Sequence, residues 1–228
     1  MIEGLIFDSD DTIFNTSRTS AKNLQWGLQR FNEETGSDYP VVTPEQALAV
    51  YASTWTEWMQ LLLGREDIDE FVEFYKSISH EQPHKYHPLQ GALESLARTR
   101  ELVKIQGVVT SSNEDNFIKK FRNVGVEPEQ FFDFWFTLDN NPYRKPDSRA
   151  LEPGIQIMWE QGIPLSRIRY VGDSTVDHQC AVAAKIGFSG VLTGQQRKEL
   201  KDLRMQGDNI NLPSIKHIPN YVEIMNGL

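Results

Sequence analysis

Hydrophobic and polar positions follow two different patterns along the chain, and the change between them predicts its fold. From about residue 89 onward, segments with helical spacing alternate with short apolar runs that have the length of buried strands. These runs do not alternate apolar with polar residues, which is typical of strands covered on both faces in a parallel sheet. The pattern predicts right-handed crossovers and a doubly wound α/β core. The predicted strands are residues 5–7, 103–109, 134–136, 168–171 and 188–192, and the predicted core helices are 89–100, 114–124, 148–161, 175–186 and a last one from Asn220.

Between the first strand and this alternating region the chain has only helical spacing. Thr43 and Gln46 have the residue types and separation of a capping box, which predicts a helix that begins directly after Thr43. Three helices are predicted here, at residues 17–34, 44–64 and 67–79. Because they interrupt the alternation, we predict that they form a separate inserted domain. The predicted domains are an α/β core of residues 1–14 and 88–228 and a helical cap of residues 15–87.

Composition and charge narrow the class of protein. The chain has 228 residues, of which 39% are hydrophobic and 24% charged, as is ordinary for a soluble globular protein. The net charge of −9 argues against nucleic acid or an anionic membrane surface as the main partner. The single cysteine, Cys180, fits a reducing compartment, and no apolar run approaches the ~20 residues of a membrane span. We therefore expect a cytoplasmic protein, with a monomer as the default.

Acidic, hydroxyl and basic side chains occur just after predicted strands or in a tight loop before a helix. Ligands of open α/β sheets bind beyond the carboxyl ends of the strands, so we expect these side chains to meet at one end of the sheet. Asp8 and Asp10 are so close in sequence that their charges repel, and a bound divalent cation or a shared proton would relieve this repulsion. The candidate site residues are Asp8, Asp10, Thr110, Ser111, Lys145, Asp173 and Asp177.

Four short motifs in this order resemble those of the haloacid dehalogenase superfamily, in the branch with a helical cap inserted after the first motif. This branch includes phosphoglycolate-phosphatase-like and β-phosphoglucomutase-like proteins. The motifs are DxDxT at residues 8–12, Thr110 at the end of an apolar strand, Lys145 before a proline, and GDxxxD at residues 172–177. Asp11 is a departure, because a glycine is commoner there in the family. The resemblance covers residues 2–194 and implies a Rossmann-like core and a Mg²⁺-dependent phosphatase that acts on a small phosphorylated metabolite.

The resemblance also implies a role for each candidate residue. Asp8 would be the nucleophile that forms an aspartyl-phosphate, and Asp10 would protonate the leaving oxygen and then activate water. Lys145, the Thr110 hydroxyl and the Ser111 backbone amide would bind phosphoryl oxygens. The implied Mg²⁺ ligands are the carboxylates of Asp8 and Asp173, the backbone carbonyl of Asp10 and, more weakly, Asp177.

Three alternatives stay open at the level of the sequence. A phosphomutase of the same family would carry the same motifs. A receiver-type signalling domain also combines Asp, Thr or Ser, and Lys around Mg²⁺, but its acceptor aspartate lies in a mid-chain strand and it has no inserted cap. A non-catalytic binding protein would not need the complete set of residues. Asp10 argues against a dehalogenase, because halide leaves without a proton. The sequence does not specify the substrate, and the cap residues that could contact it are Arg18, Lys22, Trp55, Trp58 and Arg65.

Overall fold

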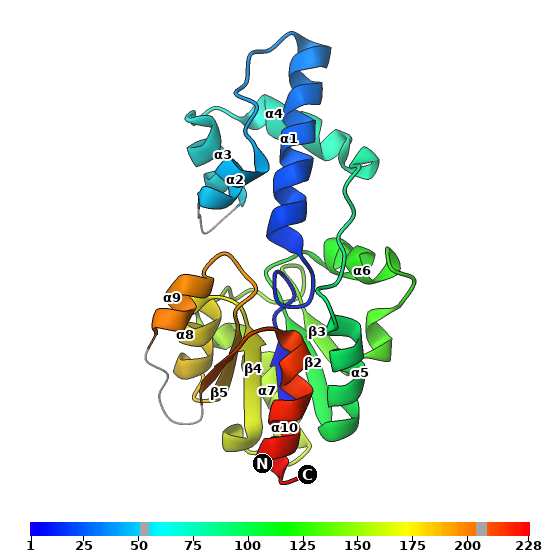
Figure 1. The fold of residues 1–228 in the computed structure, drawn as a ribbon, viewed down its shortest axis with the longest axis vertical. Helices are drawn as coiled ribbons and strands as arrows, with labels where there is room; N and C mark the ends of the chain where they lie inside the picture. The colour runs from blue at the N-terminus through cyan, green and yellow to red at the C-terminus, as the bar shows by residue number, and fades with distance from the viewer. Residues whose placement is uncertain (51–54, 204–208) are drawn as a thin grey trace. The chain divides into compact units, whose positions relative to one another are not determined.

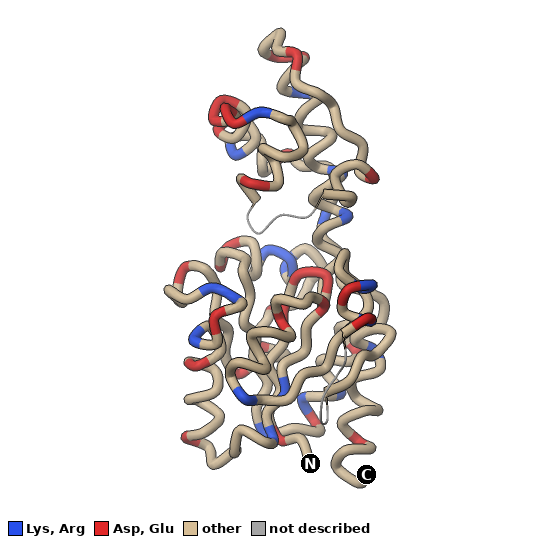
Figure 2. The backbone as a smooth tube through the Cα atoms, turned by 90° about the vertical axis from the view of Figure 1, so that its left-hand side faces the viewer, with Lys and Arg blue, Asp and Glu red and all other residues tan. Residues whose placement is uncertain are grey.

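The computed structural model of the protein describes residues 1–50, 55–203 and 209–228, and the chain divides into two compact units (Figure 1). One unit consists of Met1–Asn15 and His87–Leu228, and the other of Thr16–Tyr86. Basic and acidic residues are interspersed along both units, so the net charge of −9 is spread over the chain (Figure 2). Within the described ranges, every helix falls short of the length and apolar character that crossing a membrane requires.

A parallel sheet forms the middle of the first unit and confirms the predicted α/β fold. Within the described residues it has six strands in the order β3-β2-β1-β4-β5-β6. The first strand is central, because Ile6 pairs in register with Gly107 of β2 on one side and with Tyr170 of β4 on the other. The strands are β1 (Gly4–Phe7), β2 (Ile105–Val109), β3 (Phe134–Phe136), β4 (Ile168–Gly172), β5 (Gly187–Val191) and β6 (Ile210–Leu212).

Helices cover both faces of this sheet (Figure 1). Successive strand residues point to opposite faces, so Leu5 and Phe7 join one hydrophobic core while Ile6 joins another. The first core includes side chains of α5, α6 and α10, and the second includes side chains of α7, α8 and α9. Burial on both faces explains why the strands are continuous apolar runs. The helices are α5 (Ala92–Leu102), α6 (Glu114–Arg122), α7 (Glu152–Glu160), α8 (Thr175–Ala183), α9 (Arg197–Asp202) and α10 (Ile218–Asn226).

The second unit consists of helices that pack around a core of their own. Thr43 and Gln46 form the predicted capping box at the start of α2. The single helix predicted for residues 44–64 is wrong in part, because α2 ends at Ala49 and the next residue, Val50, has an extended backbone. Residues 51–54 of that predicted helix lie outside the described residues. The helices are α1 (Thr16–Thr35), α2 (Pro44–Ala49), α3 (Trp55–Leu63) and α4 (Asp69–Ser77).

The C-terminal part of the sheet differs from the sequence prediction. The apolar pattern does not predict β6, because the strand has three residues, each only half-buried, with Asn211 in the middle. It lies at the edge of the sheet and pairs only with β5 among the described strands. α10 begins at Ile218, two residues before the predicted start, with Pro219 in its first turn, where the missing N–H of a proline costs nothing.

Candidate active site

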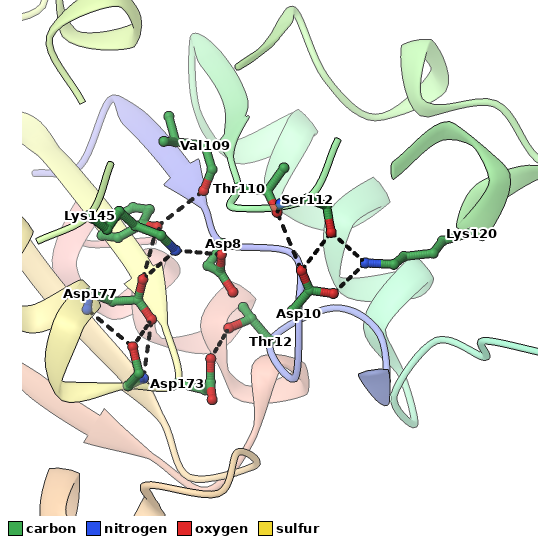
Figure 3. Close-up of polar contacts among 12 residues, drawn as sticks. Asp8, Asp10, Thr12, Val109, Thr110, Ser112, Lys120, Lys145, Asp173 and Asp177 are labelled. Carbon is green, nitrogen blue, oxygen red and sulfur yellow. Dashed lines mark hydrogen bonds and ion pairs between the residues drawn. The ribbon is translucent and has the colours of Figure 1, made fainter. Parts of the chain in front are cut away.

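The acidic turn after β1 lies beyond the carboxyl end of the central strand. The Asp8 N–H donates to the Val171 carbonyl at 2.8 Å and extends the pairing with β4 by one residue. The chain then folds back, as two later N–H groups donate to the Ser9 carbonyl at 2.9 and 3.1 Å. Asp11 has a φ of 54°, in the left-handed region that non-glycine residues seldom adopt. This turn directs the side chains of Asp8 and Asp10 toward different neighbours (Figure 3).

Asp8 lies in a buried ion-pair network. The Lys145 ammonium donates to Asp8 Oδ1 at 2.6 Å and to Asp177 Oδ1 at 2.7 Å (Figure 3). All three side chains are buried, with at most 8% of each exposed. The Tyr170 hydroxyl also lies 3.0 Å from Lys145 Nζ and 3.1 Å from Asp177 Oδ1. Lys145, from the loop before α7, thus holds the nucleophile candidate and is itself held by side chains from β4 and α8.

Asp177 is oriented by the start of its own helix. Ser174 is the N-cap of α8, and its hydroxyl accepts from the Asp177 N–H at 3.1 Å. In return Asp177 Oδ2 accepts from the Ser174 hydroxyl at 2.6 Å and from the Ser174 N–H at 3.1 Å. Both carboxylate oxygens of Asp177 therefore accept hydrogen bonds, one from the helix cap and one from Lys145.

Asp173 is enclosed by two loops. The Thr12 hydroxyl donates to Asp173 Oδ1 at 3.2 Å. On the other side lies Gly194, where a Cβ atom would come within 1.6 Å of Asp173 Oδ2. The neighbouring Thr193 donates its hydroxyl to the Asp11 carbonyl at 2.6 Å, which joins the loop after β5 to the acidic turn. The position of this carboxylate thus depends on a backbone approach that only glycine permits.

The Asp10 carboxylate contacts a second group of side chains. The Ser112 hydroxyl donates to Asp10 Oδ2 at 2.8 Å, and the Thr110 hydroxyl lies 3.5 Å from the same oxygen (Figure 3). The Lys120 ammonium forms an ion pair with Asp10 Oδ1 and donates to the Ser112 hydroxyl at 3.1 Å. Asp8 and Asp10 are therefore two residues apart in sequence but paired with different lysines.

Burial dominates the electrostatics of the nucleophile candidate. Loss of hydration raises the pKa of Asp8 to about 7 from an ordinary value of 3.8. The Lys145 ammonium opposes this rise in pKa, while the carboxylates of Asp177 and Asp10 add to it. Burial likewise raises the pKa of Asp173, with further increases from the nearby carboxylates. The ionised forms of these acids therefore need more positive charge than the protein supplies.

Lys145 supplies the protein's own positive charge to this cluster. Burial alone would lower its pKa, but the carboxylates of Asp177 and Asp8 outweigh burial and raise the Lys145 pKa well above its ordinary value. The lysine is therefore charged at neutral pH. A fixed ammonium at 2.6 Å both orients the Asp8 carboxylate and could attract a bound anion.

The acidic cluster has the composition of a divalent cation site. Among the described residues, oxygen atoms of Asp8, Asp173 and Asp177 all lie within 4.8 Å of one another, and all three residues are buried. When all three carboxylates are ionised they face one ammonium, which leaves two negative charges for a bound cation to balance. Hard, anionic oxygen donors are the ligands that Mg²⁺ prefers, so the residues present fit this ion.

Six of the seven candidate residues lie in two groups. Asp8, Lys145, Asp173 and Asp177 form the buried cluster, and Thr110 lies beside Asp10. Ser111 is the exception among the side chains, since it is exposed, and its expected contribution is its backbone amide. The sequence analysis placed Thr12 in the first motif without a role, and it missed the side chains of Ser112, Lys120 and Tyr170 at this end of the sheet. The signal for Lys120 was present in the sequence, as a lysine on the apolar face of a helix.

Comparisons with known proteins identify the family. The sequence profile of the haloacid dehalogenase-like hydrolases matches residues 5–191. No curated protein matches the chain. Solved structures match it over nearly the full length of both chains, at identities that show the fold alone.

Three of these solved structures illustrate the identities, TM-scores and coverages of the matches. A hydrolase of the same superfamily from Geobacter sulfurreducens has 21% identity and a TM-score of 0.69, with 97% of this chain and 96% of that chain covered. A predicted phosphoglycolate phosphatase from Haemophilus somnus has 17% identity and a TM-score of 0.73, with coverage of 96% and 97%. CbbY from Rhodobacter sphaeroides, solved in complex with phosphate, has 18% identity and a TM-score of 0.67, with 96% of each chain covered. Together with the profile match over residues 5–191, the fold shows that this chain belongs to the haloacid dehalogenase-like hydrolase family.

Proposed function

We propose that this protein is a Mg²⁺-dependent phosphatase that hydrolyses a small phosphorylated metabolite through an aspartyl-phosphate on Asp8. The observation that carries the proposal is the buried Asp8 carboxylate, held at 2.6 Å by Lys145 in a cluster of three acids that, within the described residues, only one ammonium of the protein faces. A carboxylate in such a site can attack an anionic phosphate only when a cation offsets the repulsion. Asp8, Asp173 and the Asp10 carbonyl would hold Mg²⁺, with Asp177 as a weaker ligand, and the ion would supply that charge.

The proposed reaction has two steps. A carboxylate oxygen of Asp8 forms a bond to phosphorus while the bond to the leaving oxygen breaks, and Asp10 gives that oxygen its proton. Water then attacks the same phosphorus, passes a proton to Asp10 and releases the Asp8 carboxylate with its electron pair. Lys145, the Thr110 hydroxyl and the Ser111 amide would hold the phosphoryl oxygens during both steps.

Other proteins of this fold support the substrate class. The related structures include one named as a predicted phosphoglycolate phosphatase and one solved with phosphate. We further propose that residues 15–87, which contain the helical unit, act as a cap that selects the substrate. The candidate contacts there are Arg18, Lys22, Trp55, Trp58 and Arg65. A cytoplasmic location and a monomeric state stay predictions.

The test separates the two aspartates with p-nitrophenyl phosphate, whose phenolate leaves without a proton. Wild type should turn over only with Mg²⁺ and lose activity in excess chelator. Asp8→Asn should form no covalent intermediate. Asp10→Asn should release a burst of about one equivalent of p-nitrophenol and then stall, because hydrolysis of the intermediate lacks its base.

Alkyl phosphates extend this test. Their alkoxide needs the proton of Asp10, so Asp10→Asn should show no burst with them. Steady turnover of p-nitrophenyl phosphate by Asp10→Asn near the wild-type rate would remove Asp10 from the mechanism. Transfer of the phosphoryl group to a second sugar phosphate, in place of release to water, would favour a phosphomutase.

A further inference from the structure

A buried lysine lies on the core-facing side of α6. The buried residues of this helix are Phe117, Lys120 and Phe121, at the spacing of an apolar stripe. Only 2% of the Lys120 side chain is exposed. An ammonium at such a position loses its hydration, and an apolar residue would fill the same space without that cost. Packing alone therefore does not account for a lysine here.

The contacts of this lysine converge on Asp10. The Lys120 ammonium forms an ion pair with Asp10 Oδ1, while the Ser112 hydroxyl donates to Asp10 Oδ2 at 2.8 Å. Lys120 also donates to the Ser112 hydroxyl at 3.1 Å, so the three side chains form a closed ring of contacts (Figure 3). Each oxygen of Asp10 is thus held by a different donor from α6 or the loop before it.

The exposure of the two partners differs in a way that matters for chemistry. Lys120 is almost fully buried, whereas 31% of the Asp10 side chain is exposed. The ammonium therefore approaches the carboxylate from the protein interior and leaves another part of it accessible. A carboxylate that has an ion pair on its buried side and stays partly exposed is suited to exchange a proton with a bound molecule.

We propose that Lys120 and Ser112 are positioning residues that fix the Asp10 side chain, which gives a proton to the leaving oxygen as a carboxylic acid and then takes one from water as a carboxylate. This inference rests on the proposed phosphatase function. An aspartate side chain has two free torsions, and a displacement of about 1 Å in a catalytic group can cost ~10²-fold in rate. The Lys120 ammonium contacts the Asp10 carboxylate and the Ser112 hydroxyl, and on this assignment it does not contact the substrate. Its effect on catalysis therefore passes through Asp10.

The experiment compares Lys120→Met with Lys119→Met, a control on the exposed side of the same helix. Methionine keeps the length and apolar packing of the lysine stem but removes the ammonium. With an alkyl phosphate and saturating Mg²⁺, Lys120→Met should lower kcat by ~10²-fold with little change in KM, because Asp10 acts on the reaction rather than on binding. Lys119→Met should match wild type.

A double mutant separates positioning from a general structural role. In steady-state turnover of p-nitrophenyl phosphate, Asp10→Asn and Lys120→Met should each be slow, and the combined variant should be no slower than Asp10→Asn alone. Ser112→Ala, at a half-exposed position, provides the same comparison if Lys120→Met does not fold, with an expected loss in kcat of about 10-fold.

The outcomes are distinguishable. Wild-type kcat for Lys120→Met, or for Ser112→Ala when the first variant does not fold, would overturn the assignment and leave the phosphatase function in place. Losses that multiply in the double mutant would also overturn it, because they would show that Lys120 acts independently of Asp10. A wild-type protein without Mg²⁺-dependent turnover of any phosphate monoester would overturn the proposed function and this assignment together.

Discussion

Gly194 offers a direct test of how the acidic cluster is held. A Cβ atom at this position would lie 1.6 Å from Asp173 Oδ2, and real Cβ contacts stay above 3.0 Å, so Gly194→Ala must widen this gap by about 1.4 Å. The backbone of Gly194 is outside the positive-φ region, so alanine itself causes no conformational strain. Either the Asp173 carboxylate or the loop has to move, and Thr12 holds the other oxygen of Asp173 at 3.2 Å.

The expected consequence is weaker metal binding with an intact fold. Displacing one ligand or its support typically costs ~10–100-fold in metal affinity, so the Mg²⁺ concentration for half-maximal activity should rise by about that factor. The Mg²⁺-dependent rise in melting temperature should shift to higher concentration by the same factor, which gives a reading independent of turnover.

Gly125→Ala is the matched control for a general loss of stability. Gly125 has a φ of +78°, and a Cβ atom there would meet no described atom within 4 Å beyond its two chain neighbours. Alanine at this position therefore strains the backbone by roughly 1 kcal/mol without touching the site. This variant should melt earlier than wild type with an unchanged Mg²⁺ requirement. Wild-type Mg²⁺ dependence of Gly194→Ala in both assays would refute the view that this glycine positions Asp173.

Three further outcomes follow from other contacts. Tyr170→Phe removes the hydroxyl 3.0 Å from Lys145 Nζ and should lower kcat by about 10-fold in steady-state assays, with KM as the internal control. The Arg100 guanidinium holds the pKa of Asp133 below its usual range, so this carboxylate stabilises the fold above its unfolded pKa and loses that effect as pH falls through the folded pKa. Asp133→Asn should therefore cost about 1 kcal/mol in urea unfolding at pH 7 and progressively less below pH ~4; an equal cost at both pH values would contradict this. Asp11→Gly, at a φ of 54°, should keep full activity and change the unfolding free energy by no more than about 1 kcal/mol.

The sequence was sufficient to predict the elements that carry the candidate site. β1 is a continuous apolar run because it lies in the middle of the sheet with both faces covered, and this burial is visible as hydrophobicity. The carboxyl ends of parallel strands share one edge, so residues separated by more than 100 positions, such as Asp8 and Asp173, could be expected to meet there.

The parts that sequence did not predict depend on contacts between segments distant along the chain. Tyr170 looks like one more apolar residue of β4, and only the structure shows its hydroxyl beside Lys145. Gly194 lies in a loop, where glycine is common for many reasons, and its closeness to Asp173 comes from tertiary packing. β6 is too short and too exposed to leave a hydrophobic pattern. In each case the missing information is a spatial neighbour.

Lys120 and Lys145 offset the charges of different carboxylates in the site. Lys120 balances Asp10, while Lys145 balances only part of the cluster of Asp8, Asp173 and Asp177. An unbalanced carboxylate at 4 Å from one phosphate charge would cost about 4 kcal/mol at an effective dielectric constant of ~20. In the second step Asp10 acts as a carboxylate base beside the phosphoryl group, and the Lys120 ammonium offsets that repulsion while 31% of the Asp10 side chain stays exposed. On the proposed mechanism, the cluster around Asp8 therefore requires a divalent cation. Asp10 does not, because Lys120 supplies the positive charge beside it.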